Sequence, residues 1–145
     1  MRWSKIAFIA LCALGLLIQL IPYGRKHANP RVVKEPPWDS PATRALAKRA
    51  CFNCHSYETE WPFYASIAPA SWMVTSDVTE GREMLNFSDW QGGSRPGENA
   101  KAVQDEIEEG EMPPIMYRLA HADARLNADE QKRLIEGWRR TVEAP

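Results

Sequence analysis

The sequence predicts a small all-α domain that follows an N-terminal apolar helix and a proline-rich tether. Three observations carry this prediction. Apolar residues recur at helical spacing in several stretches, helix start and stop signals flank those stretches, and one run near the N-terminus is almost wholly apolar. We expect a membrane anchor over residues 1–23, a linker over residues 24–39 and a helical domain over residues 40–145.

Length and composition narrow the functional classes. A chain of 145 residues has room for one small domain plus accessory segments. A formal net charge of −1 gives no bias toward nucleic acid, and the sequence contains no Gly-rich phosphate-binding loop. We therefore expect no nucleic-acid partner.

The first element is an apolar run from Ile6 to Ile21, which only Gln19 and two small residues interrupt. Trp3 and Tyr23 flank it, as aromatic residues flank membrane spans at the lipid–water interface. Between these two aromatics a helix would reach about 30 Å, enough to cross a thin bilayer. We expect an uncleaved anchor, and the alternative is a signal peptide cut after Gly15.

The next segment, residues 24–39, contains three prolines and no apolar periodicity, so we expect an extended tether. Ser40 and Pro41 then form a helix start, with Ser as the N-cap and Pro at the first helical position. Small apolar residues repeat every four positions from Ala42 to Ala50, which predicts a helix that another helix can cross closely.

This helix runs into the sequence Cys51-Phe52-Asn53-Cys54-His55, the C-x-x-C-H pattern of c-type haem attachment. Two thiols three residues apart lie on one helical turn, so both can reach the vinyl groups on one edge of a porphyrin. His55 can then offer an imidazole nitrogen to the iron as the proximal ligand. We expect one covalent haem c. A zinc site would need four ligands, a redox C-x-x-C needs a βαβ setting, and a disulfide would leave His55 unexplained.

An aromatic and proline-rich loop follows over residues 58–72. Trp61, Tyr64 and Trp72 are candidates for the wall of the haem pocket, although they are equally well read as ordinary core aromatics. From Pro69 a helical stretch continues to about Leu85, where Gly81 weakens the prediction.

The candidate sixth ligand comes next. A helix over residues 100–109 closes at Gly110, and a Met-Pro-Pro sequence follows it directly. Met112 therefore lies on a loop stiffened by prolines, where a weak thioether ligand can be held, and His/Met ligation raises a haem's reduction potential. Met112 is the preferred ligand to the iron. His121 is the main alternative, and Met116 is also open.

The last element is a helix that begins at Asn127, which caps it together with Glu130. Leu134, Trp138 and Val142 belong to its apolar stripe. We expect it to pack across the helix that precedes the haem motif.

Taken together, several short motifs resemble the bacterial haem-binding domain family of exported c-type haem proteins over about residues 38 to 142. The resemblance rests on the following stretches: Cys51 to Ser56, Thr59-Glu60-Trp61-Pro62, Ile67-Ala68-Pro69 to Trp72, Glu80-Gly81-Arg82, Leu85-Asn86-Phe87-Ser88, and Gly110 to Pro114 with Tyr117 and His121. The layout is also similar to that of small monohaem cytochromes c. The resemblance implies haem binding with Cys51, Cys54 and His55 as the attachment residues.

These features predict an electron carrier rather than an enzyme. We expect a single-pass protein of the bacterial inner membrane with its haem domain facing the periplasm, where covalent haem attachment takes place, and with redox proteins as partners. Two alternatives stay open: a haem sensor or peroxidase-like protein with an open sixth coordination site, and an accessory subunit of a membrane redox complex.

Overall fold

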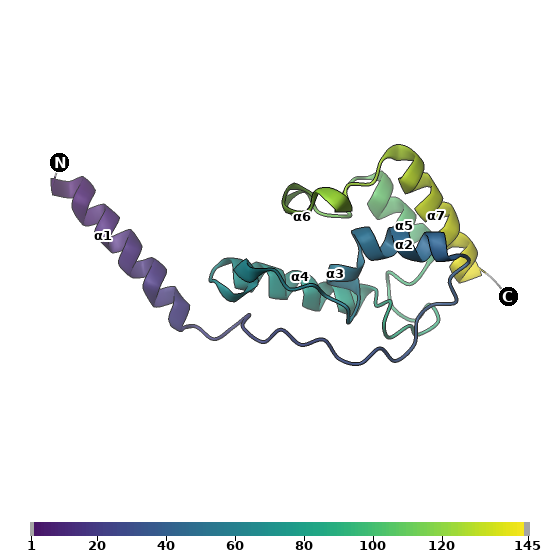
Figure 1. Cartoon of the computed structure of the whole chain (residues 1–145), viewed down its shortest axis with the longest axis horizontal. Coiled ribbons are helices and arrows are strands. Elements are labelled where there is room, and N and C mark those ends of the chain that lie inside the picture. The colour runs from purple at the N-terminus through teal and green to yellow at the C-terminus, as the bar shows by residue number, and fades with distance from the viewer. Residues whose placement is uncertain (1, 144–145) are drawn as a thin grey trace. The chain divides into compact units, whose positions relative to one another are not determined.

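The computed structural model describes residues 2–143, which form helices and no β-strand (Figure 1). The elements are α1 (Arg2–Leu17), η1 (Ile18–Leu20), α2 (Pro41–Ala50), α3 (Phe52–His55), η2 (Phe63–Ser66), α4 (Ala70–Met84), α5 (Ala100–Glu108), α6 (Ile115–Ala120), η3 (Ala122–Ala124) and α7 (Ala128–Glu143). The all-helical prediction is confirmed.

The chain divides into two compact units. Residues 1–28 and 61–77 form the first, and residues 29–60 and 78–145 form the second. The first unit contains α1, η1, η2 and the first half of α4. The second contains the remaining helices and the haem motif.

In the first unit, α1 and η1 provide one helix that is long and apolar enough to cross a membrane. This stretch, Trp3–Leu20, has a mean hydropathy of 1.9, and none of it is buried. A membrane span and a signal sequence both have these properties.

The helix starts of the second unit follow the predicted caps. The hydroxyl of Ser40 accepts a hydrogen bond from the backbone N–H of Thr43 at 3.2 Å, and Pro41 is the first residue of α2. At the start of α7, Asn127 and Glu130 exchange two backbone-to-side-chain hydrogen bonds of 2.9 and 3.0 Å. Both predicted helix starts are confirmed.

Helix α7 packs against both α5 and α2 (Figure 1). Its crossing with α2 is close, because a Cβ atom on Gly137 would lie 2.8 Å from Cγ2 of Thr43. The predicted packing of the last helix across the helix before the motif is therefore confirmed. The contact runs through a glycine of α7 and a buried threonine of α2.

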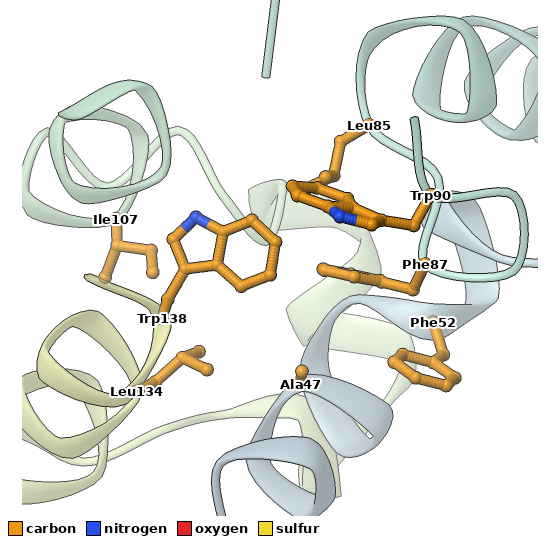
Figure 2. Close-up of a cluster of buried hydrophobic side chains, with 8 residues drawn as sticks. All are labelled: Ala47, Phe52, Leu85, Phe87, Trp90, Ile107, Leu134 and Trp138. Atoms are coloured by element: carbon orange, nitrogen blue, oxygen red, sulfur yellow. The ribbon is translucent and has the colours of Figure 1, made fainter. Parts of the chain in front are cut away.

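The core of this unit is aromatic (Figure 2). Trp138 of α7 meets Phe87 and Trp90 edge-on, with ring centroids 5.5 Å apart in each pair. Phe87 in turn stacks on Phe52 at 5.2 Å. Such pairs contribute about 0.5–1.5 kcal/mol beyond the burial of their area. Because Phe52 lies inside the C-x-x-C-H motif, this core fixes the motif.

The residues before α2 are tied to the second unit as well. Val33 donates a backbone hydrogen bond to Ser88 at 2.8 Å, and Trp90 donates one to Lys34 at 2.9 Å. The carboxylate of Glu35 accepts two hydrogen bonds from Arg44, at 2.7 and 2.6 Å. The segment from about residue 33 onward therefore runs along the helical unit in an extended conformation.

Candidate functional site

The C-x-x-C-H motif forms a single helical turn directly after α2. Cys51 caps the end of α2, and its carbonyl oxygen accepts hydrogen bonds from the backbone N–H groups of Cys54 and His55 at 3.2 and 2.9 Å. Phe52, only 2% exposed, holds the turn in the core. Both cysteines are half-buried and neither is in a disulfide, and burial raises the pKa of the Cys51 thiol to about 12. The motif therefore presents both thiols from one turn, and that of Cys51 is protonated at neutral pH.

The ring of His55 is oriented by two backbone carbonyl groups of the second unit. Its Nδ1 lies 2.8 Å from the carbonyl oxygen of Gly81 and 3.1 Å from that of Leu85. Carbonyl oxygens only accept hydrogen bonds, so Nδ1 carries the proton and Nε2 keeps a free lone pair. Metal-binding histidines are commonly held in this way, with the other ring N–H donated to a backbone carbonyl.

Burial lowers the pKa of His55 below its ordinary value. The imidazole is therefore neutral at physiological pH, which is the form that binds iron. Tautomer, orientation and protonation state all suit His55 as a ligand through Nε2.

Gly81 explains how α4 approaches the motif so closely. A Cβ atom at this position would lie 2.8 Å from the carbonyl oxygen of Cys54 and 3.1 Å from its carbonyl carbon. Real Cβ atoms essentially never come within 3.0 Å of a backbone atom. The glycine that weakened the helix prediction is thus the residue that lets α4 bring a carbonyl group to His55.

The neighbouring Arg82 fastens the chain that leaves the motif. Its Nε donates to the carbonyl oxygen of Ser56 at 2.8 Å, and its guanidinium also donates to Oγ1 of Thr59 at 3.0 Å. The same group lies 5.2 Å from the ring centroid of Tyr57. Arg82 therefore supports the site through the backbone of the residues that follow His55.

Helix α6 is joined to the motif by its tyrosine. The amide nitrogen of Asn53, between the two cysteines, donates to the hydroxyl of Tyr117 at 2.7 Å. Burial raises the pKa of Tyr117 to about 12, so the hydroxyl is neutral. The remaining large apolar side chains of α6 are exposed: Ile115 by 60%, Met116 by 65% and Leu119 by 63%. A short helix tied to the motif therefore presents an uncovered apolar surface, a common mark of a binding site.

The candidate sixth ligands lie on either side of this helix. Met112 precedes α6, is 37% exposed, and its backbone N–H donates to Glu106 at 3.0 Å. His121 follows α6, and its ring stacks on Tyr117 at 4.1 Å between centroids. Its Nδ1 lies 3.1 Å from the carbonyl oxygen of Tyr117, so its Nε2 is also the free nitrogen. Both side chains remain candidates.

The three predicted pocket aromatics belong to the first unit. Trp61 stacks on His27 at 4.6 Å, and Tyr64 meets Phe63 edge-on at 5.6 Å. The indole nitrogen of Trp72 is buried and makes no hydrogen bond within residues 2–143. A role for these side chains against haem stays a prediction.

Two features of the site escaped the sequence analysis. The first is the hydrogen bond from Asn53 to Tyr117, which joins residues 64 positions apart. The second is the pair of carbonyl groups that orient His55, one from Gly81 on α4 and one from Leu85 just after this helix. The glycine at position 81 was the one available signal for the second, because a glycine inside a helix often marks a close approach.

The described residues fit haem better than a bare metal ion. Within residues 2–143, no group of three or more His, Cys, Asp or Glu side chains is placed to hold a metal ion. The site instead offers two thiols, one oriented imidazole and an apolar helix surface, which suit a flat macrocycle with iron at its centre.

Comparison with known proteins supports this interpretation. The model of the haem-binding domain family matches residues 13–140, which is most of the chain. No match was found among curated proteins or among solved structures. The motif, its oriented histidine and this match together show that the chain belongs to the family of haem-binding domains.

Proposed function

We propose that this haem-binding protein is a membrane-anchored monohaem c-type cytochrome that transfers single electrons on the periplasmic side of the inner membrane. The observation that carries the proposal is the geometry of Cys51 to His55. Two thiols outside any disulfide share one helical turn, and the imidazole that follows them is fixed with Nε2 available. When bound, haem supplies a one-electron ferrous–ferric couple.

Residues of this chain would both attach the cofactor and cover part of its surface. Cys51 and Cys54 would form the two thioether bonds, and His55 would be the proximal ligand. Helix α6 would supply an apolar surface to the cofactor, because its exposed Ile115, Met116 and Leu119 would gain cover from a macrocycle. The hydrogen bond between Tyr117 and the motif would keep that surface in register with the attachment turn.

Met112 is our proposed sixth ligand. Its position is held on both sides. Its backbone N–H is hydrogen-bonded to Glu106, and α6 begins three residues later at Ile115. A thioether favours ferrous iron, so this ligand would raise the reduction potential and suit an electron carrier. His121 is the alternative, and the bond of its Nδ1 to a backbone carbonyl would prepare it for the same role.

Spectroscopy of the ferric and ferrous protein tests this assignment. A low-spin ferric spectrum with the weak long-wavelength sulfur-to-iron band, together with slow binding of carbon monoxide to the ferrous form, would support a carrier. The substitution Met112→Ala should remove that band and lower the potential, while Met84→Ala, at an exposed methionine of α4, should change neither. Loss of low-spin character in His121→Ala but not in Met112→Ala would assign His121 instead.

The exposure of the methionines near α6 favours a second candidate function, a haem sensor or peroxidase-like protein. Met112 and Met116 are both exposed, at 37 and 65%, so water reaches both residues. A haem sensor or peroxidase-like protein needs such an open sixth site. High-spin ferric iron and rapid carbon monoxide binding would favour this function over electron transfer.

The N-terminal helix supports membrane attachment. The family model begins at residue 13, inside α1, so it includes the last turn of this apolar helix. Gln19, beyond the signal-peptide site at Gly15, is hydrogen-bonded to Ala68 in the first unit. A chain cut after Gly15 would keep this bond but expose a new apolar terminus. Carbonate washing of membranes, followed by N-terminal sequencing, separates an anchor from a cleaved signal. Recovery of soluble haem protein with a new N-terminus would contradict the anchor.

A further inference from the structure

A pair of hydrogen bonds joins the end of the apolar helix to a loop far along the sequence. The side-chain amide of Gln19 donates to the carbonyl oxygen of Ala68 at 2.9 Å, and its carbonyl oxygen accepts from the N–H of Ala68 at 3.0 Å. The side chain of Gln19 thus satisfies both the backbone N–H and the backbone carbonyl group of Ala68. Gln19 is also the one strongly polar residue within the apolar run, so its presence there is explained by this contact.

Two further contacts hold the same loop against the residues that follow the helix. The Nε2 atom of His27 lies 2.9 Å from the carbonyl oxygen of Ala65, and the His27 ring stacks on Trp61. A Cβ atom on Gly24 would lie 2.5 Å from the carbonyl oxygen of Ser71, so the two backbones touch. The loop is therefore fixed at the end of the helix by contacts along much of its length.

The loop has the composition of a lipid contact. No charged residue occurs between Trp61 and Ser76. Ala65 and Ala68 are buried, at 0 and 7%, whereas Phe63 is 82% exposed and Ile67 49% exposed. Phe63 and Ile67 lie four positions apart on and beside η2, so the turn directs large apolar side chains away from the protein.

The length of the helix sets the level of this turn relative to a bilayer. Helices α1 and η1 together cover Arg2–Leu20. At about 1.5 Å per residue they span about 28 Å, close to the roughly 30 Å of a hydrocarbon core. Gln19 then lies at the boundary between acyl chains and headgroups, and Ala68 lies within hydrogen-bonding distance of it. Tryptophan and tyrosine side chains favour this level, and the turn contains Trp61 and Tyr64.

We propose that the turn around Phe63 and Ile67 is a second membrane contact, which enters the lipid interface beside the end of the anchor. The partner that covers Phe63 and Ile67 is the surface of the bilayer. Arg25 and Lys26, exposed just after the helix, would meet anionic headgroups at the same level. The inference rests on the anchor of the proposed function and adds a fixed height for the first unit above the acyl chains.

Photo-crosslinking of the full-length, haem-loaded protein in vesicles of phosphatidylethanolamine and phosphatidylglycerol tests the proposal. Benzoyl-phenylalanine replaces Phe63 in one variant, Phe8 of α1 in a second and Lys101 of α5 in a third. After illumination, intact-mass spectrometry counts chains that have gained one lipid. We expect the probes at positions 63 and 8 to capture lipid with similar yield, and the probe at 101 to yield several-fold less.

The three positions separate the possible failures. Capture at position 8 but not at 63 overturns the second contact and leaves the anchor intact, and the exposed turn would then be free for a protein partner. No capture at either position overturns the anchor and the inference together. If the probe at position 101 captures as much lipid as the probe at 63, the benzoyl-phenylalanine side chain binds lipid wherever it is placed. This result also overturns the inference.

A second variant tests the connection to Gln19. The substitution Gln19→Leu keeps the anchor apolar but removes both hydrogen bonds to Ala68. We expect the lipid yield at position 63 to fall several-fold while the yield at position 8 is unchanged. An unchanged yield at 63 would show that the glutamine does not position the turn.

Discussion

Replacing Gly81 by alanine tests whether the close approach of α4 to the haem motif is as tight as the structure shows. In an ordinary helix interior Gly→Ala stabilises by about 1 kcal/mol. Here the new methyl group would lie 2.8 Å from the carbonyl oxygen of Cys54, an atom of the backbone that cannot rotate away. Overpacking of this kind costs about 1–3 kcal/mol. Because a backbone contact this short belongs at the upper end of that range, we expect a net loss of about 1–2 kcal/mol.

The same change should weaken the support of His55. Moving α4 away by a few tenths of an ångström stretches the hydrogen bond between Nδ1 and the carbonyl oxygen of Gly81, now 2.8 Å long. We expect a smaller fraction of the chains to carry haem after expression. The control is Glu83→Ala, an exposed position on the same helix, where the change should stay within about 0.5 kcal/mol.

Urea unfolding followed by far-ultraviolet circular dichroism measures the first effect, and the ratio of haem to polypeptide absorbance measures the second. A Gly81→Ala protein that is as stable as the wild type, or more stable, and that carries a full complement of haem would refute the reasoning. The helix would then have room for a side chain beside the motif.

Three further changes probe the second unit. Gly137→Ala, whose Cβ would meet the side chain of Thr43, should lower the free energy of unfolding by about 1–2 kcal/mol after the gain in helix propensity is subtracted, and unchanged stability in urea would contradict the close crossing. Tyr117→Phe should cost about 1 kcal/mol and speed carbon monoxide binding to ferrous protein, since α6 loses its bond to the motif. Glu35→Gln should cost about 1 kcal/mol at neutral pH. The hydrogen bonds from Arg44 lower the pKa of Glu35, so its contribution is present above the ordinary value of 4.5 and is lost as the pH falls through the lowered pKa. Equilibrium unfolding across this pH range should show the difference between Glu35→Gln and wild type disappear on the acidic side, and a constant difference would contradict the ion pair.

Local sequence signals predicted the elements whose stability is local. Ser40 caps α2, and Asn127 with Glu130 caps α7, because capping needs only residues three positions apart. The haem motif was readable for the same reason. Its function depends on a fixed spacing within one helical turn, so five consecutive residues carry the whole pattern.

Apart from the packing of α7 across α2, contacts between distant residues had no clear signal in the sequence. Helix α6 has six residues, starts after two prolines and leaves its apolar side chains exposed, so it has neither the length nor the buried stripe that marks a helix in sequence. The sequence of residues 88–99 is mostly polar, contains Gly92-Gly93 and Pro96-Gly97, and predicts an irregular loop. The structure shows that it is organised by Glu98, whose buried carboxylate accepts hydrogen bonds from Arg95 and from the backbone N–H of Gly93. The burial of a carboxylate depends on hydrogen-bond partners that the fold brings together. A single Glu in the sequence therefore does not predict it.

Intact-mass spectrometry of the denatured wild-type protein tests the central claim most directly. The protein, expressed in cells that assemble c-type cytochromes, is unfolded in acid and separated from any free cofactor before its mass is measured. If Cys51 and Cys54 carry thioether bonds, the mass is that of the processed chain plus one haem, and the protein with Cys51→Ser and Cys54→Ser shows the chain alone. A wild-type mass equal to the chain alone, from a preparation that held haem before denaturation, would contradict covalent attachment.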